Sequence, residues 1–322
     1  MDGIEKASGA GVSEALVVVL PGDRVRELAE EAVNALDVSP ASRETYRRGL
    51  RPFLAFWERR GWESPSRALV LDFKRSLEER GLSPFSVSGA LSAVRAFFRH
   101  LEALGVAPDV TRNVKGPRKP RGFSRDYLTD SEVRATLDAI PRDTRSGLRD
   151  FALVNLLGRT GIRTIEAIRA DVGDVQTQGS EKVLRVHRKG HGGKDDAVLL
   201  VPEAHGPLLA YLALRQGVRE DAPLFASESD RNAGGRLTTR TVRNIVEECM
   251  KAAGVKRPRV TAHSLRHTFG TLTQAAGAPT LRVRDAMGHA SVATTETYVH
   301  ALDRFGPDAA ERYFRLPGDG QE

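Results

Sequence analysis

Residues 112–125 read RNVKGPRKPRGFSR and divide the chain into two parts that differ in composition. Six of these fourteen residues are basic, none is acidic, and the two prolines and two glycines disfavour regular secondary structure. Such a run is typical of a solvated linker, and a linker between two domains with a common anionic partner can also follow that partner. The sequence therefore predicts a basic linker and a domain boundary over these residues.

The stretch before the linker predicts a small helical domain over residues 39–111. Ser39-Pro40 and Ser83-Pro84 each place a serine at a helix N-cap with a proline at the first helical position. Apolar residues follow both pairs at helical spacing, and a further helix is expected over residues 66–80. Residues 1–38 are interpreted as an acidic leader that contains one amphipathic helix.

The stretch after the linker predicts a second, mainly helical domain over residues 126–302. Thr129-Asp-Ser-Glu132 has the pattern of a capping box that opens a helix. Two strands are expected, Lys182–His187 and Ala197–Val201, separated by the turn-rich segment RKGHGGKDD. Residues 303–322 remain as a C-terminal tail. The expected fold class is mainly α with a small antiparallel β-sheet.

The charges are unevenly distributed along the 322 residues. The whole chain has 49 Lys+Arg against 42 Asp+Glu, a balance of +7, but residues 1–38 hold 3 basic and 8 acidic residues. Residues 39–122 hold 17 basic and 8 acidic residues. A basic middle region favours an anionic partner, nucleic acid before a membrane. We therefore expect Arg118, Lys119 and Arg121 to contact DNA.

The composition excludes several other classes of protein. Cys249 is the only cysteine, so a disulfide framework and a cysteine-based zinc site are excluded and a reducing cytoplasm is favoured. The longest aliphatic run, Ala15–Leu20, is far shorter than the roughly 20 residues of a membrane span. The sequence has no phosphate-binding loop of the nucleoside triphosphatases and no clustered carboxylates. We expect a cytoplasmic protein with no membrane partner, no cofactor and no metal.

Four short segments carry residue types suited to phosphodiester chemistry. They are TGIRTIEAI (160–168), HRKGHGGK (187–194), HSLRHTFGT (263–271) and MGHASVATTETYVH (287–300). Singly, each has a structural explanation, such as a surface arginine, a solvated pair on a helix face or a core tyrosine. His263 and His267 have the i, i+4 spacing of a zinc helix, but the glutamate of that motif is missing and Arg266 adds a cation.

In this order the four segments resemble the tyrosine recombinase, or phage integrase, family of the simple two-domain type, similar to Xer-like or compact mobile-element integrases. The resemblance runs from about residue 129 to 300 and more weakly through the N-terminal helices. It implies an N-terminal helical core-binding (SAM-like) domain and an α+β catalytic domain that act on double-stranded DNA. It also implies a homo-tetramer on two DNA sites, built from protomers that are monomeric in free solution.

The resemblance also implies a set of catalytic residues. These are Arg163, Lys189, His263, Arg266, His289 and Tyr298. Two guanidiniums can clamp the non-bridging oxygens of a pentavalent phosphorus, where charge accumulates in the transition state, better than an ammonium can. The family pattern gives this role to Arg163 and Arg266. It makes Tyr298 the nucleophile, which forms a covalent 3′-phosphotyrosyl intermediate.

The remaining residues of the set are expected to transfer protons or to donate a hydrogen bond. His263 is expected to act as general base or proton relay, and His289 to hydrogen-bond the phosphate. Lys189 matches the lysine of the family's G-K-G turn, written here Arg188-Lys189-Gly190, and would protonate the leaving 5′-oxygen. Lys194 in the same turn is the alternative. Glu166 is expected to orient Arg163 by hydrogen bonding.

Three functions are compatible with these residues. A site-specific recombinase, which cleaves and rejoins DNA strands without metal or ATP, is the preferred interpretation. A type IB topoisomerase shares the arginine, lysine, histidine and tyrosine set and relaxes supercoils as a monomer, but the separate N-terminal domain favours the recombinase. A DNA-binding relative that has lost catalysis would lack one of these residues, whereas every position is filled. Integration, excision and resolution of DNA are left open by the sequence.

Overall fold

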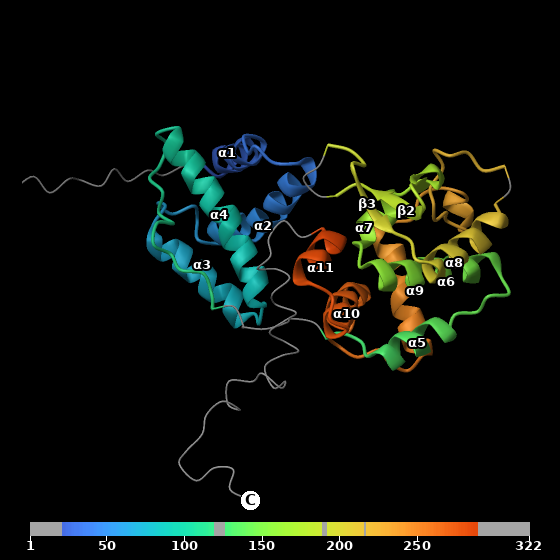
Figure 1. Ribbon diagram of the computed structural model, residues 1–322. Helices are drawn as coiled ribbons and strands as arrows, with labels where there is room; N and C mark the ends of the chain where they lie inside the picture. Colours follow the sequence, from blue (N-terminus) through green and yellow to red (C-terminus); the bar gives the residue numbers. More distant parts are fainter. Residues whose placement is uncertain (1–20, 119–125, 189–191, 216, 289–322) are drawn as a thin grey trace, which may run out of the picture. The chain divides into compact units, whose positions relative to one another are not determined.

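The computed structural model describes residues 21–118, 126–188, 192–215 and 217–288 (Figure 1). The chain divides into two compact units, Met1–Pro120 and Arg121–Glu322, and the division falls inside the basic stretch 112–125. None of the helices among these residues is long and apolar enough to cross a membrane.

The first unit is a helical domain. Its helices are α1 (Gly22–Asn34), α2 (Pro40–Arg59), α3 (Arg67–Glu79) and α4 (Pro84–Ala103). Ser39 and Ser83 cap α2 and α4, as predicted: their hydroxyls accept hydrogen bonds from the backbone N–H groups of Ser42 and Ser86 at 3.3 and 3.2 Å. Aromatic rings fill the core, because the ring of Phe53 lies 5.2–5.7 Å from three others.

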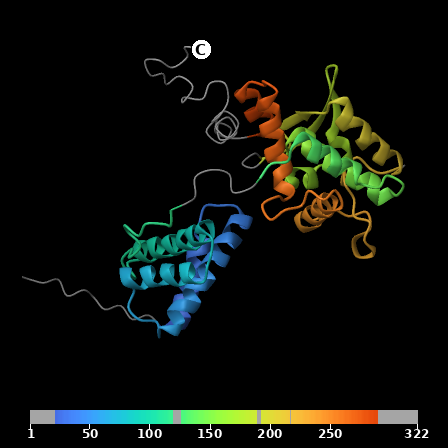
Figure 2. The same cartoon turned by 90° about the horizontal axis from the view of Figure 1, so that it is seen from below.

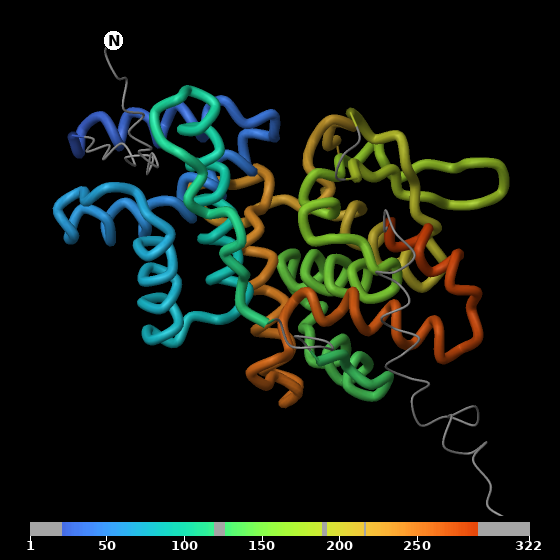
Figure 3. The backbone as a smooth tube through the Cα atoms, turned by 90° about the vertical axis from the view of Figure 1, so that its left-hand side faces the viewer, coloured from blue at the N-terminus to red at the C-terminus, as the bar shows by residue number. Residues whose placement is uncertain are grey.

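The helix of the acidic leader and the start of the linker belong to this domain rather than flanking it. Helix α1 packs against both α2 and α4, as can be followed in Figure 3, and buries Val25 and Leu28 in the common core. The boundary predicted at residue 39 therefore cuts through a single packed unit. At the other end, Val114 is buried in the same core and Arg112 forms hydrogen bonds to Glu102 at 2.8 and 2.9 Å.

The second unit combines helices with one small sheet. Its helices are α5 (Asp130–Asp138), α6 (Arg145–Thr160), α7 (Thr164–Arg169), η1 (Val172–Asp174), α8 (Pro202–Ala213), η2 (Asp230–Asn232), α9 (Thr239–Ala252), α10 (Ala262–Ala275) and α11 (Thr280–Met287). Thr129 and Glu132 form the predicted capping box at α5.

The sheet contains a strand that the sequence did not predict. Strands β1 (Val175–Gln178), β2 (Glu181–Val186) and β3 (Asp196–Leu199) pair antiparallel in that order. The two predicted strands correspond to β2 and β3, whereas β1 reads VQTQ and is mostly exposed. Because Val175 is the one apolar residue of β1 that packs against the core, the strand lacks the alternating pattern from which a half-buried strand is recognised.

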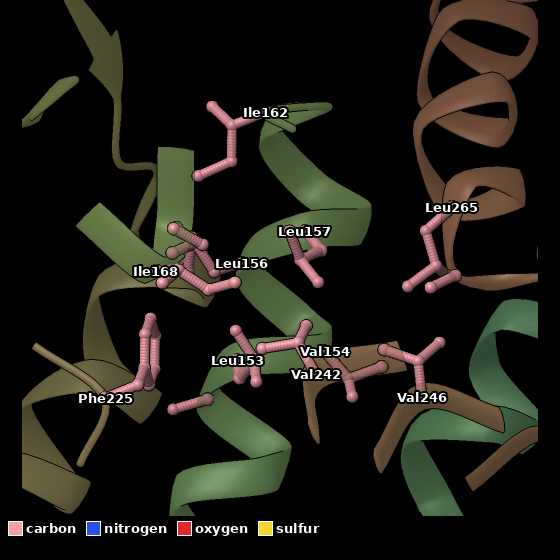
Figure 4. Close-up of a cluster of buried hydrophobic side chains, with 14 of the residues drawn as sticks. Leu153, Val154, Leu156, Leu157, Ile162, Ile168, Phe225, Val242, Val246 and Leu265 are labelled. Carbon is pink, nitrogen blue, oxygen red and sulfur yellow. The ribbon is translucent and has the colours of Figure 1, made fainter. Parts of the chain in front are cut away.

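Helix α6 forms the centre of the core of the second unit. It packs beside α8, as Figures 1 and 2 show, and it also contacts α10. Figure 4 shows Leu153, Val154, Leu156 and Leu157 of α6 among the buried side chains that surround them. Burial of these side chains removes a large apolar area from water and fixes the C-terminal end of α6, where the first candidate segment begins.

Candidate active site

Arg163 lies directly after the sharp turn that ends α6. Gly161 in this turn has a left-handed φ of 62°, and a β-carbon at this position would lie 2.4 Å from a ring atom of Phe269. Arg163 then forms the N-cap of α7. The turn therefore places the Arg163 backbone close to α10, which carries Phe269 and the third candidate segment.

A buried carboxylate holds Arg163 in place. Oε1 of Glu166 accepts a hydrogen bond from Nη1 of Arg163 at 2.8 Å, and Oε2 accepts one from the Arg163 backbone N–H at 2.8 Å. Glu166 is only 1% exposed, while the Arg163 side chain is 31% exposed. The predicted hydrogen bond between these residues is thus present, and it leaves part of the guanidinium facing solvent.

Arg266 on α10 is almost fully buried and joins two distant turns. Its Nη1 donates to the carbonyl oxygen of Gly161 at 2.5 Å, and its Nη2 donates to the carbonyl oxygen of Met287 at 2.7 Å. The first of these carbonyls follows α6 and the second ends α11. Arg163 and Arg266, separated by a hundred residues of sequence, therefore lie around the same turn.

Three arginines converge on the C-terminus of α11. Successive carbonyls there accept hydrogen bonds, each from a different segment: Arg188 Nη2 to Ala286 at 2.9 Å, Arg266 Nη2 to Met287 at 2.7 Å and Arg163 Nη2 to Gly288 at 3.2 Å. The last carbonyls of a helix have no partners within the helix, and the negative end of its dipole favours cations. Three guanidinium groups therefore lie at the C-terminal end of α11, directly before His289 in the sequence.

The acidic groups around these arginines are fewer than the cations. Arg188 is 3% exposed; its Nε donates to Asp196 Oδ2 at 2.7 Å and its Nη1 to Glu166 Oε2 at 3.5 Å. Three arginines thus face two carboxylates among the described residues of the cluster. A net positive charge that is held rigidly in this way suits a bound anion such as a phosphate.

His263 lies at the N-terminal end of α10, with its ring centroid 4.9 Å from that of His267. It is exposed and lines a cavity of about 400 Å³. Thr164, the residue after Arg163, lines the same cavity, as does Arg243 on α9. His263 is therefore close to the N-terminus of α7, where Arg163 begins the helix.

Lys194 is not among the residues that converge on α11. Its Nζ is held by the carboxylates of Asp171 and Asp174, and Arg236 binds Asp171 as well. Partial burial lowers the pKa of Lys194, but the hydrogen bonds to the two carboxylates outweigh this effect and raise the pKa. Desolvation raises the pKa of Asp171, and its cationic partners Arg236 and Lys194 more than offset it, so that this pKa is lowered.

Several predicted residues lie outside the described part of the chain. They are Lys189, His289 and Tyr298 of the catalytic set, and Lys119 and Arg121 of the linker. Arg118 is described and its side chain is exposed. The sequence analysis did not predict one residue of the cluster, Arg188, which was named only as part of a turn. The available signal was an arginine in a position where the family's turn has a glycine.

Comparison with known proteins assigns the chain to a family. Residues 126–304 match the phage integrase family, and residues 32–105 match the phage integrase N-terminal SAM-like domain. The chain is 30% identical over 286 residues to the tyrosine recombinase XerA of Pyrococcus furiosus, which covers 89% of this chain and 93% of that relative. The chain therefore belongs to the phage integrase family of tyrosine recombinases, enzymes that cleave and rejoin DNA.

Another relative agrees with this assignment, and two solved structures share the fold. The tyrosine recombinase XerD of Mycobacterium tuberculosis is 33% identical over 282 residues, covering 80% of this chain and 88% of that relative. The site-specific recombinase XerH bound to its difH substrate has a TM-score of 0.66 at 22% identity, covering 87% of this chain and 82% of that one. A lambda integrase dimer bound to a COC′ core site has a TM-score of 0.68 at 16% identity, covering 93% and 80%. These likenesses confirm the predicted fold class.

Proposed function

We propose that the chain is a site-specific DNA recombinase that cleaves duplex DNA through a covalent 3′-phosphotyrosyl intermediate. The observation that carries this proposal is the convergence of Arg163 and Arg266 on the C-terminus of α11. The residue that follows Gly288 is His289, and Tyr298 follows nine residues later. An anion bound beside the two guanidiniums would thus be near the segment that carries the nucleophile.

The two arginines would stabilise the transition state of phosphoryl transfer. In-line attack on a phosphodiester builds negative charge on the non-bridging oxygens, and preorganised guanidiniums can neutralise it without rearranging. Glu166 and the α11 carbonyls hold Arg163 and Arg266 before the DNA arrives. His263 would serve as general base or relay near Arg163, and His289 would donate a hydrogen bond to the phosphate.

The covalent step exchanges one phosphoester bond for another. The hydroxyl group of Tyr298 gives its proton to His263 and its oxygen bonds to the phosphorus. The bond from phosphorus to the 5′-oxygen breaks, and the leaving oxygen takes a proton from Lys189. Rejoining reverses the step, with the 5′-hydroxyl of a partner strand as nucleophile. Because the intermediate conserves the energy of the phosphodiester, strand exchange needs no ATP.

The partner of both units would be double-stranded DNA, and four protomers would act on two sites. The charge distribution supports this, since the basic excess lies in residues 39–122. XerH and lambda integrase were solved on DNA substrates, and this chain shares their fold. The family resemblance further implies that the free protein is a monomer, which would assemble on its recombination sites.

The test of this function is the trapping of a covalent adduct. Nicked duplexes that tile the DNA flanking the gene would serve as suicide substrates, because loss of the short fragment prevents rejoining. We expect one site to give a protein–DNA adduct that resists SDS and carries the protein on a 3′-phosphate. Relaxation of supercoils by monomers, with no recombination between paired sites, would instead identify a topoisomerase.

Lys194 provides a prediction that separates the two candidate general acids. Lys194→Met should retain cleavage within about 3-fold of the wild-type rate, whereas Lys189→Met should lose about 100-fold or more, the usual contribution of a general acid. Lys194 is bound by two carboxylates, and its raised pKa makes it a weaker proton donor. The cleavage rate of each variant is measured at saturating DNA. The reverse pattern would make Lys194 the general acid.

The linker prediction concerns the salt dependence of DNA binding. Changing Arg118, Lys119 and Arg121 to glutamine should weaken binding and lower the slope of log K against log salt concentration by up to about 3, close to one unit per phosphate contact. Arg112→Gln is the control, because its side chain binds Glu102 within the domain. Electrophoretic mobility shifts at several salt concentrations give the slopes. An unchanged slope would make the linker a solvated tether only.

A further inference from the structure

Arg188 is a buried arginine that connects three separate parts of the second unit. It lies two residues after the end of β2, and its guanidinium bonds to Asp196 at the start of β3, to Glu166 on α7 and to the carbonyl of Ala286 on α11. The side chain is 3% exposed. Removing an arginine from water is unfavourable unless its donors are satisfied, and here the donors are shared among elements far apart in sequence.

The backbone around Arg188 is closely fitted to α11. Gly288 has a left-handed φ of 62°, and a β-carbon there would lie 2.5 Å from the guanidinium carbon of Arg188. A glycine is thus required at this point both by the backbone conformation and by the arginine. The two chain segments that touch here are the ones that continue into Lys189 and His289.

We propose that Arg188 is a positioning residue for strand cleavage, which fixes the start of the Lys189 turn against the C-terminus of α11. This inference rests on the proposed function. The hydrogen bonds of Arg266 described above go to carbonyl oxygens, whereas Arg188 bonds to two carboxylates, Asp196 and Glu166, which balance its charge. We therefore assign Arg188 no contact with the phosphate. Its role is geometric: it sets the point from which the general acid reaches the 5′-oxygen.

A charge role and a geometric role predict different results for substitutions. A lysine at position 188 keeps the buried positive charge but cannot reach three partners in a plane, because an ammonium lacks the guanidinium fork. Arg188→Lys should therefore fold and bind DNA yet cleave slowly. Displacement of a reacting group by about 1 Å can cost about 100-fold in rate, so a loss of this order is expected at saturating DNA.

The experiment measures single-turnover cleavage of a nicked suicide duplex as a function of DNA concentration. Arg188→Lys and Arg188→Ala should lower the rate at saturating DNA by about 100-fold and leave the half-saturating concentration within about 2-fold of wild type. In a second duplex, sulfur replaces the bridging 5′-oxygen. The leaving group is then a 5′-thiolate, which does not need a proton from a general acid. If Arg188 acts through Lys189, most of the defect should disappear on this substrate.

Arg149→Ala is the matched control, because Arg149 is also buried and also binds a carboxylate, Asp150, and a carbonyl, that of Ala226. It should lower the melting temperature without slowing cleavage. Lys189→Ala should be rescued by the sulfur substrate, and Arg163→Ala should not. A wild-type rate for Arg188→Lys, or a defect that sulfur does not relieve, would overturn the role of Arg188. Failure of the wild-type protein to form any adduct would instead overturn the proposed function.

Discussion

Tyr298→Phe is expected to abolish the covalent protein–DNA adduct completely while leaving DNA binding unchanged. Phenylalanine keeps the ring and removes only the oxygen that would bond to phosphorus. The rate of adduct formation should fall below detection, because the variant lacks the phenolic oxygen that forms the covalent bond to phosphorus. Denaturing gels of the suicide reaction measure the adduct, and mobility shifts under native conditions measure binding.

Tyr127→Phe is the control for this substitution. Tyr127 lies at the start of the second unit, the residue is 38% exposed, and the proposed mechanism assigns it no role. It should form the adduct at the wild-type rate. Digestion of the wild-type adduct should leave the DNA on the peptide that contains Tyr298. A full-strength adduct from Tyr298→Phe would assign the nucleophile to another residue and contradict the proposed mechanism.

Local patterns in the sequence predicted most of the helices. Ser39-Pro40 and Ser83-Pro84 specify helix starts by a side-chain cap and a fixed φ, and both caps form. The capping box at Thr129 forms for the same reason. These signals depend on neighbours within four residues. β1 was missed because its stability comes from pairing with β2, which its own sequence does not encode.

Long-range packing decided the features that the sequence could not predict. The apolar spacing in α1 predicted a helix but did not identify α2 and α4 as the helices that cover it, so α1 was assigned to a leader rather than to the helical domain. Arg163 and Arg266 were recognised from their motifs, yet their shared attachment to α11 depends on the whole fold. Arg188 was overlooked because its partners on α7, β3 and α11 are between 8 and 98 residues away.

Arg266→Ala is expected to reduce both cleavage and stability, and the two effects can be separated. Loss of the guanidinium removes half of the proposed phosphate clamp, for which a decrease of about 1000-fold in the cleavage rate is expected. It also leaves the carbonyls of Gly161 and Met287 without their donor, at about 1–3 kcal/mol of unfolding free energy for each buried group. Single-turnover cleavage and urea denaturation measure the two losses.

Arg215→Ala distinguishes a catalytic from a purely structural role of Arg266. Arg215 is equally buried, and its Nη1 likewise donates to two carbonyls, those of Pro223 at 2.7 Å and Leu224 at 2.9 Å, away from the converging arginines. The two alanine variants should therefore lose similar unfolding free energy, while only Arg266→Ala loses cleavage at temperatures where both are folded. Arg266→Lys should regain part of the stability and little of the rate, because an ammonium cannot bridge the phosphate and α11 at once. Equal cleavage by the two alanine variants would show that Arg266 serves the fold alone.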